Sequence, residues 1–220
     1  MKNPIQMKSM KIPACFAVLL AALLAFPLHQ ALADQDPHAV VEGVTEKLLS
    51  DISSYRKALN DAGDRSEREA RMADFLGQLQ QTLEPVVDFP WIALNVMGSH
   101  RQTATPEQQE RFREVFTRAL VETYGRGLLS YSGQDIVVLP SGAGQRRVTV
   151  RQEIRGADGR IPLLYSMGVD SDGDWKVVNV IINGINLGTT FRNQFAQSYS
   201  RYGGDIDKVV DNWAVQNPDN

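Results

Sequence analysis

The sequence predicts an α+β domain in which helices pack on one face of a curved antiparallel sheet of about four strands. Two features predict this class. Apolar residues recur at the three- and four-residue spacing of helices before residue 131 and again after residue 189. Between residues 134 and 182 they alternate with polar residues, which is the period of strands. Helices, then consecutive strands, then helices again is an order typical of α+β domains.

The N-terminal segment has the three parts of a secretory signal peptide. It starts with a positively charged stretch, continues with an apolar run at 14–26, and ends with the small residues of a cleavage site at 31–33. The apolar run is too short to span a bilayer as a helix. We therefore expect residues 1–33 to be cleaved and residues 34–220 to form a single domain.

Removal of the signal peptide changes the composition of the chain in two ways. The single cysteine, Cys15, is lost, so the remaining domain has no disulfide, thiol nucleophile or thiolate metal site. Lys2, Lys8 and Lys11 are lost with no acidic residue, so 23 basic residues become 20 against 26 acidic ones, a net charge of −6. An acidic domain without a basic tract is not expected to bind nucleic acid or to adhere to anionic membranes.

The first half of the domain reads as helices. Residues 37–60 and 65–83 have the apolar spacing of two helices, and the residues at 61–64 separate them. An irregular passage at 85–89 leads to a short apolar segment at 91–97.

A long helix is expected from Thr105 to Tyr131. It opens with a Thr cap, Pro in the first helical position and Gln three residues after the cap, which together predict a capping box. Its apolar face mixes large aromatic residues with Thr123 and Gly127. Small residues on a packed face either let a neighbour approach closely or leave space for something else.

The second half of the domain reads as a meander followed by helices. The strands are expected at 134–139, 147–155, 161–169 and 175–182. Within the second strand, Val148, Val150, Gln152 and Ile154 should face one way, so one face of the sheet is buried and the other is wet. Two helices, expected at 189–202 and 205–216, close the domain.

Motifs for catalysis are missing from the sequence. The mature domain has only His38 and His100, which are not spaced as metal ligands, and it has no nucleophile elbow, phosphate loop or dinucleotide fingerprint. The carboxylates at 170–174 resemble a calcium loop, but the glycine is misplaced and no closing Glu follows, so a hairpin turn is expected there. We therefore expect a protein that is not an enzyme, with no catalytic residue, metal site or cofactor.

Short motifs occur in order along nearly the whole mature domain, at 85–89, 98, 104–108, 175–180, 183–187, 191–195 and 204–207. Behind a signal peptide, these motifs and their spacing resemble the MlaC-type, toluene-tolerance family of periplasmic phospholipid-binding proteins. The sequence departs from that family at His100 and Arg101, where an aromatic pair is common, and at Asn179 and Asn183, which are often acidic.

The resemblance implies a soluble periplasmic carrier. Such a carrier shuttles phospholipid between an outer-membrane lipoprotein–porin complex and the inner-membrane Mla transporter complex, and so maintains outer-membrane lipid asymmetry. The resemblance also implies a fold similar to the cone-shaped nuclear-transport-factor-2-like domains, with acyl chains held in an apolar cavity between sheet and helices. The expected partners are a glycerophospholipid as cargo, the two membrane complexes and, only transiently, the membrane itself.

The residues expected to hold the lipid come from the long helix, from one face of the sheet and from the segment that follows the sheet. The strand residues are assigned by alternation alone. The expected lipid-binding residues are Val115, Phe116, Leu120, Tyr124, Gly127, Leu128, Val148, Val150, Ile154, Tyr165, Met167, Val178, Val180, Ile182, Ile185, Leu187, Phe191 and Phe195.

Two other functions stay open on the sequence. The first is an enzyme of a related cone-shaped fold that acts on a small apolar substrate, with Asp88 or Asp135 as the acid and Tyr124 or Tyr131 beside it. The second is a structural periplasmic adaptor whose core is filled, because an apolar stripe reports burial without saying what covers it.

Overall fold

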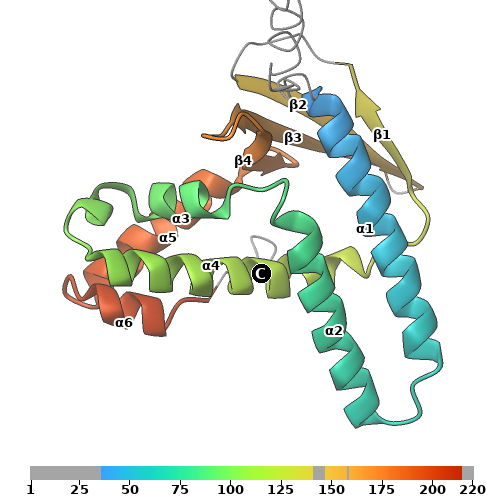
Figure 1. The fold of residues 1–220 in the computed structure, drawn as a ribbon, viewed down its shortest axis with the longest axis horizontal. Coiled ribbons are helices and arrows are strands. Elements are labelled where there is room, and N and C mark those ends of the chain that lie inside the picture. The colour runs from blue at the N-terminus through green and yellow to red at the C-terminus, as the bar shows by residue number, and fades with distance from the viewer. Residues whose placement is uncertain (1–35, 141–146, 158, 215–220) are drawn as a thin grey trace, which may run out of the picture. The chain divides into compact units, whose positions relative to one another are not determined.

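The computed structural model describes residues 36–140, 147–157 and 159–214, which form six α-helices, one short 3₁₀-helix and a five-stranded antiparallel sheet (Figure 1). The helices are α1 (Pro37–Asn60), α2 (Arg65–Leu83), α3 (Phe89–Met97), η1 (Gly98–Gln102), α4 (Pro106–Leu128), α5 (Leu187–Arg201) and α6 (Ile206–Asp211). The strands are β1 (Asp135–Leu139), β2 (Arg147–Gly156), β3 (Gly159–Val169), β4 (Trp175–Ile182) and β5 (Ile185–Asn186). The predicted signal peptide at 1–33 and most of the loop expected after β1 lie outside the described residues.

The helices α1, α2, α4 and α6 begin where the sequence predicts, because local side chains cap their first turns, whereas α5 begins at Leu187, two residues before the expected start. The capping box of α4 is confirmed: Gln108 N donates to Thr105 Oγ1 at 3.2 Å, and Thr105 N donates to Gln108 Oε1 at 3.0 Å. Asp205 caps α6. That helix ends at Asp211, earlier than the predicted position 216, because the chain turns to bury Trp213 against Phe112.

The strands follow one another in space as they do in sequence, in the order β1-β2-β3-β4-β5. The short strand β5 was not predicted. It pairs with the end of β4 across the Asn183–Gly184 turn, where both residues have positive φ, as the tightest hairpin turns require. At the other end of β4, Val87 forms a parallel bridge with Val177, which ties the irregular passage before α3 to the sheet.

The helices pack on one face of the sheet, as predicted. In Figure 1, α1 lies across the strands, and it contacts β1, β2 and β4. The helices α3 and α5 also contact β4, while α4 and α6 pack on those two helices. We call this face of the sheet, which meets α1 and the helix bundle, the inner face.

The buried apolar residues form three clusters. The bundle cluster joins α3, α4, α5 and α6, and its members include Phe112, Phe116, Phe191, Phe195 and Trp213. The sheet cluster joins α1 to the sheet through Val41, Val148, Val150, Met167 and Val177. The hairpin cluster joins α1, α2 and α4 through Ile52, Tyr55, Phe75, Leu79 and Val121.

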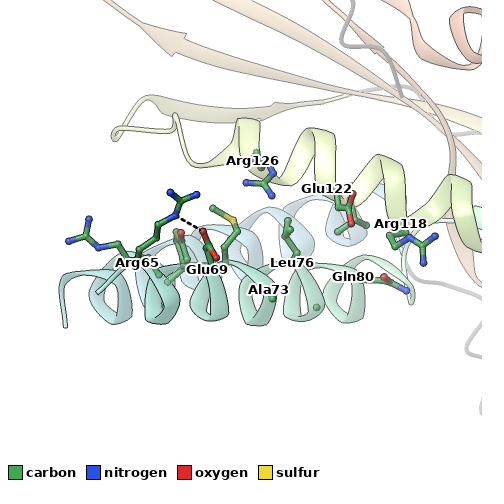
Figure 2. A pocket seen from close by; sticks show the side chains of 13 residues that line it. Arg65, Glu69, Ala73, Leu76, Gln80, Arg118, Glu122 and Arg126 are labelled. Carbon is green, nitrogen blue, oxygen red and sulfur yellow. Dashed lines mark hydrogen bonds and ion pairs between the residues drawn. The ribbon is translucent and has the colours of Figure 1, made fainter. Parts of the chain in front are cut away.

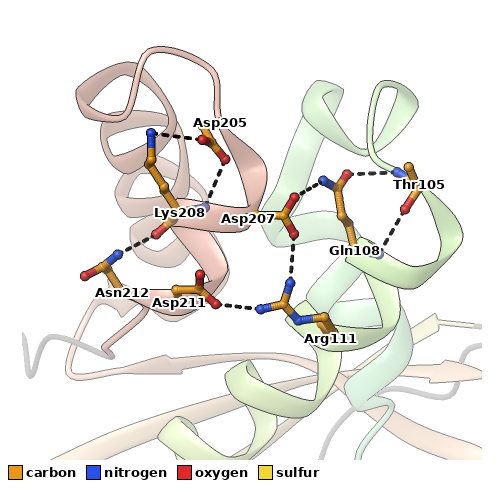
Figure 3. A network of polar contacts seen from close by, with 8 residues as sticks. All are labelled: Thr105, Gln108, Arg111, Asp205, Asp207, Lys208, Asp211 and Asn212. Atoms are coloured by element: carbon orange, nitrogen blue, oxygen red, sulfur yellow. Dashed lines mark hydrogen bonds and ion pairs between the residues drawn. The ribbon is translucent and has the colours of Figure 1, made fainter.

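An ion-pair network fixes α6 on the first half of α4 (Figure 3). Arg111 Nη1 lies 2.8 Å from Asp207 Oδ1, and Arg111 Nη2 lies 2.5 Å from Asp211 Oδ1. Gln108 Nε2 donates to Asp207 Oδ2 at 2.8 Å. These side chains are half exposed, so the network orients the two helices more than it stabilises them.

The close contact between α2 and α4 depends on Gly125, which is buried. A Cβ atom at this position would lie 2.6 Å from Leu79 Cδ2 and 2.8 Å from Leu76 Cδ2. At Gly127, two residues further on, a Cβ atom would meet nothing within 4 Å. A small residue on a helix can either let a neighbouring helix approach closely or leave space beside it, and α4 has both cases. Gly125 permits the close approach of α2, and Gly127 borders open space.

Gly125→Ala and Gly127→Ala are expected to change stability in opposite directions. Overpacking against Leu76 and Leu79 costs about 1–3 kcal/mol, which outweighs the helix-propensity gain of about 1 kcal/mol. Gly127→Ala keeps that gain and should stabilise the protein by about 0.5–1 kcal/mol. Urea unfolding of both variants measures the difference, and equal stabilisation by the two would contradict the tight α2–α4 contact.

Candidate functional site

The inner face of the sheet is built from rows of residues that lie opposite one another on neighbouring strands. The rows are Val148–Met167–Val177, Val150–Tyr165–Val180, Val138–Gln152–Leu163–Ile182–Ile185, and Ile136–Ile154–Ile161. The predicted alternation in β2 is confirmed, since Val148, Val150 and Gln152 are buried while Arg147, Thr149 and Arg151 are exposed.

A β-bulge in β4 changes one of the expected positions. Val177 lies opposite Met167 and Asn179 lies opposite Ser166, so Val178 is an extra residue in the ladder. Val178 Cγ1 is 3.4 Å from the position of a Cβ on Gly168, which belongs to the outer face. The expectation that Val178 shares a face with Val180 is therefore wrong, because the extra residue shifts the alternation by one. Val177 takes the inner position instead.

The end of the inner face beneath α1 is packed as core. Three of the expected lipid-binding residues, Val148, Val150 and Met167, belong to the sheet cluster there, together with Val41 of α1. Val150 and Met167 retain 0% and 1% of their accessible surface. These side chains pack between the sheet and α1 and hold the two together.

The opposite end of the inner face keeps apolar side chains in contact with solvent. Ile161 is 46% exposed, Ile185 is 37% exposed, and Ile154 and Ile136 are partly exposed. Each square ångström of such surface costs about 25 cal/mol in water, so an apolar ligand would gain free energy by covering it. Ile154 and Ile185 were expected at the site.

Besides Val177, the inner face holds apolar residues that were missing from the expected set, among them Ile136, Ile161 and Leu163. The signal for Ile161 and Leu163 was available in the sequence. Ile161 and Leu163 continue the two-residue spacing of Tyr165 and Met167, and Leu163 is buried as that spacing predicts.

The residues expected from α4 and α5 divide between two clusters. Val115, Phe116, Leu120 and Tyr124 pack in the bundle cluster with the α5 residues Leu187, Phe191 and Phe195. The Phe191 ring lies 5.5 Å from the Phe116 ring and 6.5 Å from the Tyr124 ring, centroid to centroid. Leu128 packs against the hairpin cluster instead. The expected residues therefore share no single cluster.

Gly127 is exposed and lies near the C-terminal end of α4, on the side of the helix that packs against the bundle. It lies one turn after Thr123 and three residues after Tyr124, which puts it on their face of the helix. Since a Cβ at Gly127 would meet nothing within 4 Å, the space beside this turn is open.

A part-buried chain of hydrogen bonds crosses the inner face between α1 and the sheet. The Tyr165 hydroxyl donates to Gln152 Oε1 at 2.8 Å, and Gln152 Nε2 donates to Thr45 Oγ1 at 2.8 Å. The Thr45 hydroxyl donates to the Val41 carbonyl at 2.7 Å. Burial raises the pKa of Tyr165 well above its usual value. The chain supplies hydrogen bonds to groups that would otherwise be buried without partners.

The groups named for an enzyme do not converge. Asp88 caps α3 by accepting from Trp91 N at 2.9 Å, and Asp135 is exposed at the start of β1. The Tyr131 hydroxyl donates to the Gln134 carbonyl at 3.1 Å, and Tyr124 packs against the bundle cluster. Within the described ranges, no group of three or more His, Cys, Asp or Glu side chains could hold a metal ion.

Two grooves open on the surface of the described residues, with volumes of about 590 and 640 Å³. The first lies between α2 and α4 (Figure 2). The second lies beside Trp91 and Lys176, where α3 meets the sheet. Neither groove is lined by a residue of the expected lipid-binding set, so the predicted cavity between sheet and helices stays a prediction. In the part of the chain that is described, no helix has the length and apolarity needed to cross a membrane.

The fold is that of an α+β domain with helices on one face of an open antiparallel sheet. Part of that face is not covered by helices and keeps apolar side chains exposed to solvent. Known proteins share this fold. A phospholipid-binding protein from Ralstonia solanacearum, solved in complex with a phospholipid, matches it with a TM-score of 0.69 and 26% identity. The match covers 80% of this chain and 94% of that protein.

Comparisons of sequence lead to one family. The family model of the MlaC protein matches residues 53–215. The toluene tolerance protein Ttg2D of Pseudomonas putida is 40% identical over 199 residues, 89% of this chain and 87% of that protein. The intermembrane phospholipid transport system binding protein MlaC of Haemophilus influenzae is 23% identical over 188 residues, 82% of this chain and 83% of that protein. The chain belongs to the MlaC family.

Tyr165→Phe is expected to reduce the slope with which the free energy of unfolding falls as the pH rises above 10. An unfolded tyrosine ionises near pH 10, whereas buried Tyr165 keeps its proton, so its contribution to stability is complete below pH 10 and decreases above it. The decrease is about 1.4 kcal/mol per pH unit at first, and the phenylalanine variant lacks it. Urea unfolding at pH 8, 10 and 11 measures the slopes, and parallel curves for wild type and variant would contradict the buried position of the hydroxyl.

Proposed function

We propose that this protein is a periplasmic phospholipid carrier and not an enzyme. It is exported by the signal peptide at 1–33, and it carries phospholipid between the outer-membrane lipoprotein–porin complex and the inner-membrane Mla transporter complex, which maintains outer-membrane lipid asymmetry. The observation that carries the proposal is the phospholipid in the Ralstonia protein, whose fold this chain shares over most of its length. Membership of the MlaC family supports the same role.

The energetics of the cargo explain why such a carrier needs an apolar wall. A phospholipid has roughly thirty methylenes in its acyl chains, and exposing them to water at ~0.8 kcal/mol each would cost over ~20 kcal/mol. Hydrogen bonds to the head group, each worth about 1 kcal/mol net, cannot offset that cost. The acyl chains therefore enter a dry space while the head group stays in water.

The uncovered end of the inner face is the place for the acyl chains. Ile154, Ile161 and Ile185 offer apolar surface on the sheet side, and they lose contact with water when a chain covers them. On the helix side, the turn of α4 at Gly127 borders open space. The residues packed beneath α1 and within the bundle hold these two walls in position.

Transport by such a carrier needs partners. A binding protein shifts lipid only by its difference in affinity relative to the membranes, so direction must come from the complexes at either end. The net charge of −6 expected for the mature domain reduces its attraction to anionic membrane surfaces and keeps membrane contact transient.

Phospholipid is expected to copurify with the protein. Native mass spectrometry of freshly purified material should show the mass of the mature chain plus phospholipid, and organic extraction should release the same lipid. An apo mass together with an extract that contains no phospholipid would overturn the proposal.

Gly127→Leu is expected to lower the phospholipid content of the purified protein without lowering its stability. A leucine at this exposed helical position gains about 1 kcal/mol of helix propensity, but its side chain enters the open space beside α4. Gly43→Leu is the matched control, since Gly43 is exposed on α1 and a Cβ there also meets nothing within 4 Å.

The measurement is phospholipid per protein chain for the two variants and the wild type, with urea unfolding alongside. Only Gly127→Leu should lose lipid. Equal lipid content in all three proteins would remove Gly127 from the proposed site.

A further inference from the structure

The groove between α2 and α4 has an apolar floor that the proposed lipid site does not use. Tyr55 from α1, Met72 and Leu76 from α2, and Val121 from α4 form this floor, which continues the hairpin cluster to the surface. On the α2 side the groove is lined by Ala73 and Gly77, which are small and leave the floor accessible. We call it the α2–α4 groove.

Basic side chains surround the α2–α4 groove. Arg65, Arg68, Arg118 and Arg126 line it, against the two carboxylates of Glu69 and Glu122 (Figure 2). Arg65 Nε pairs with Glu69 at 2.8 Å. Counting only described residues, the other three arginines form no ion pair with an acidic side chain. A surplus of positive charge thus lies around an apolar floor on a chain whose net charge is negative.

The shape of the groove selects the kind of occupant. Its floor lies between two helices, so a flat bilayer surface would meet the arginines without reaching Leu76 or Val121. An amphipathic helix, in contrast, can place its apolar side in a groove between helices while its flanks stay at the rim. Carboxylates on those flanks would meet the unpaired arginines, and the charge complementarity would orient the helix and speed its association.

We propose that the α2–α4 groove binds an acidic amphipathic helix of a partner protein, with the apolar side of that helix on the floor and its carboxylates on Arg68, Arg118 and Arg126. This inference goes beyond the proposed function, because no residue of the groove belongs to the lipid-binding set. The same surface would serve a carrier or a structural adaptor.

Site-specific photo-crosslinking in the native cell envelope tests the proposal. A benzoylphenylalanine replaces Ala73, which is exposed and lines the groove, and the crosslinked partner peptide is sequenced by mass spectrometry. The expected peptide has an apolar side with acidic residues beside it. In the background of Arg118→Glu with Arg126→Glu, crosslinking should fall at least about tenfold, because two favourable charge contacts become repulsive.

The matched control is Arg147→Glu with Arg151→Glu, which reverses two exposed charges on the outer side of β2. This pair should keep wild-type crosslinking. Binding to vesicles of phosphatidylglycerol is measured for both pairs in parallel, together with urea unfolding and phospholipid content. The groove pair should retain its fold and its phospholipid, so a failure of the groove and a failure of the carrier role are read separately.

Several results would overturn the proposal. The first is the absence of any protein crosslink from position 73, and the second is a crosslinked segment without acidic residues. The third is a loss of crosslinking in the control pair as large as the loss in the groove pair. Vesicle binding that falls with the groove pair and not with the control pair would also overturn it, because it would make the arginines a membrane contact.

Discussion

The arrangement of this protein depends on the β-bulge in β4. Val177 packs beneath α1, Ile182 packs against the helix bundle, and Val180 contacts both clusters. A strict two-residue period would place Val177 and Val180 on opposite faces of the sheet. The extra residue, Val178, brings both to the inner face, so a single strand holds α1 and the bundle on the same side.

Separate clusters explain how the protein stays folded while part of its inner face is uncovered. The bundle cluster and the hairpin cluster each have their own buried aromatic residues, and neither needs the row of Ile154 and Ile161 for its packing. Among the described residues, three large apolar side chains are exposed, and two of them, Ile161 and Ile185, belong to the inner face. Most of the uncovered apolar surface among these residues is thus on the inner face, where a ligand that covers it gains free energy.

Charge is distributed unevenly along α4. In the first half of the helix, Arg111 is paired with Asp207 and Asp211 of α6 and serves to orient the bundle. In the second half, Arg118 and Arg126 line a groove and form no ion pair with an acidic side chain in the described part of the chain. The same helix therefore contributes to the fold, to the proposed lipid wall through Gly127, and to a separate basic surface.

The sequence by itself determined the class of fold, the order of the elements and most of their ends. The Thr105–Gln108 capping box and the alternation in β2 were predictable because they depend on residues close together in the chain. Most of the buried residues of the candidate site were also predictable, since helical and strand periods report burial. What a side chain packs against was not predictable in this way: Leu128 follows Tyr124 on the same helix, yet it packs against the hairpin cluster and Tyr124 against the bundle cluster.

Only the tertiary structure decided the bulge at Val178 and the different roles of Gly125 and Gly127. A bulge is a mismatch between two strands, so it cannot be read from one of them. The two glycines lie two residues apart in one helix, but Leu76 and Leu79 of α2 approach Gly125 and nothing approaches Gly127. The physical reason is the same in both cases, because spacing along one element sets the direction of a side chain and the neighbouring element decides whether that direction is filled or open.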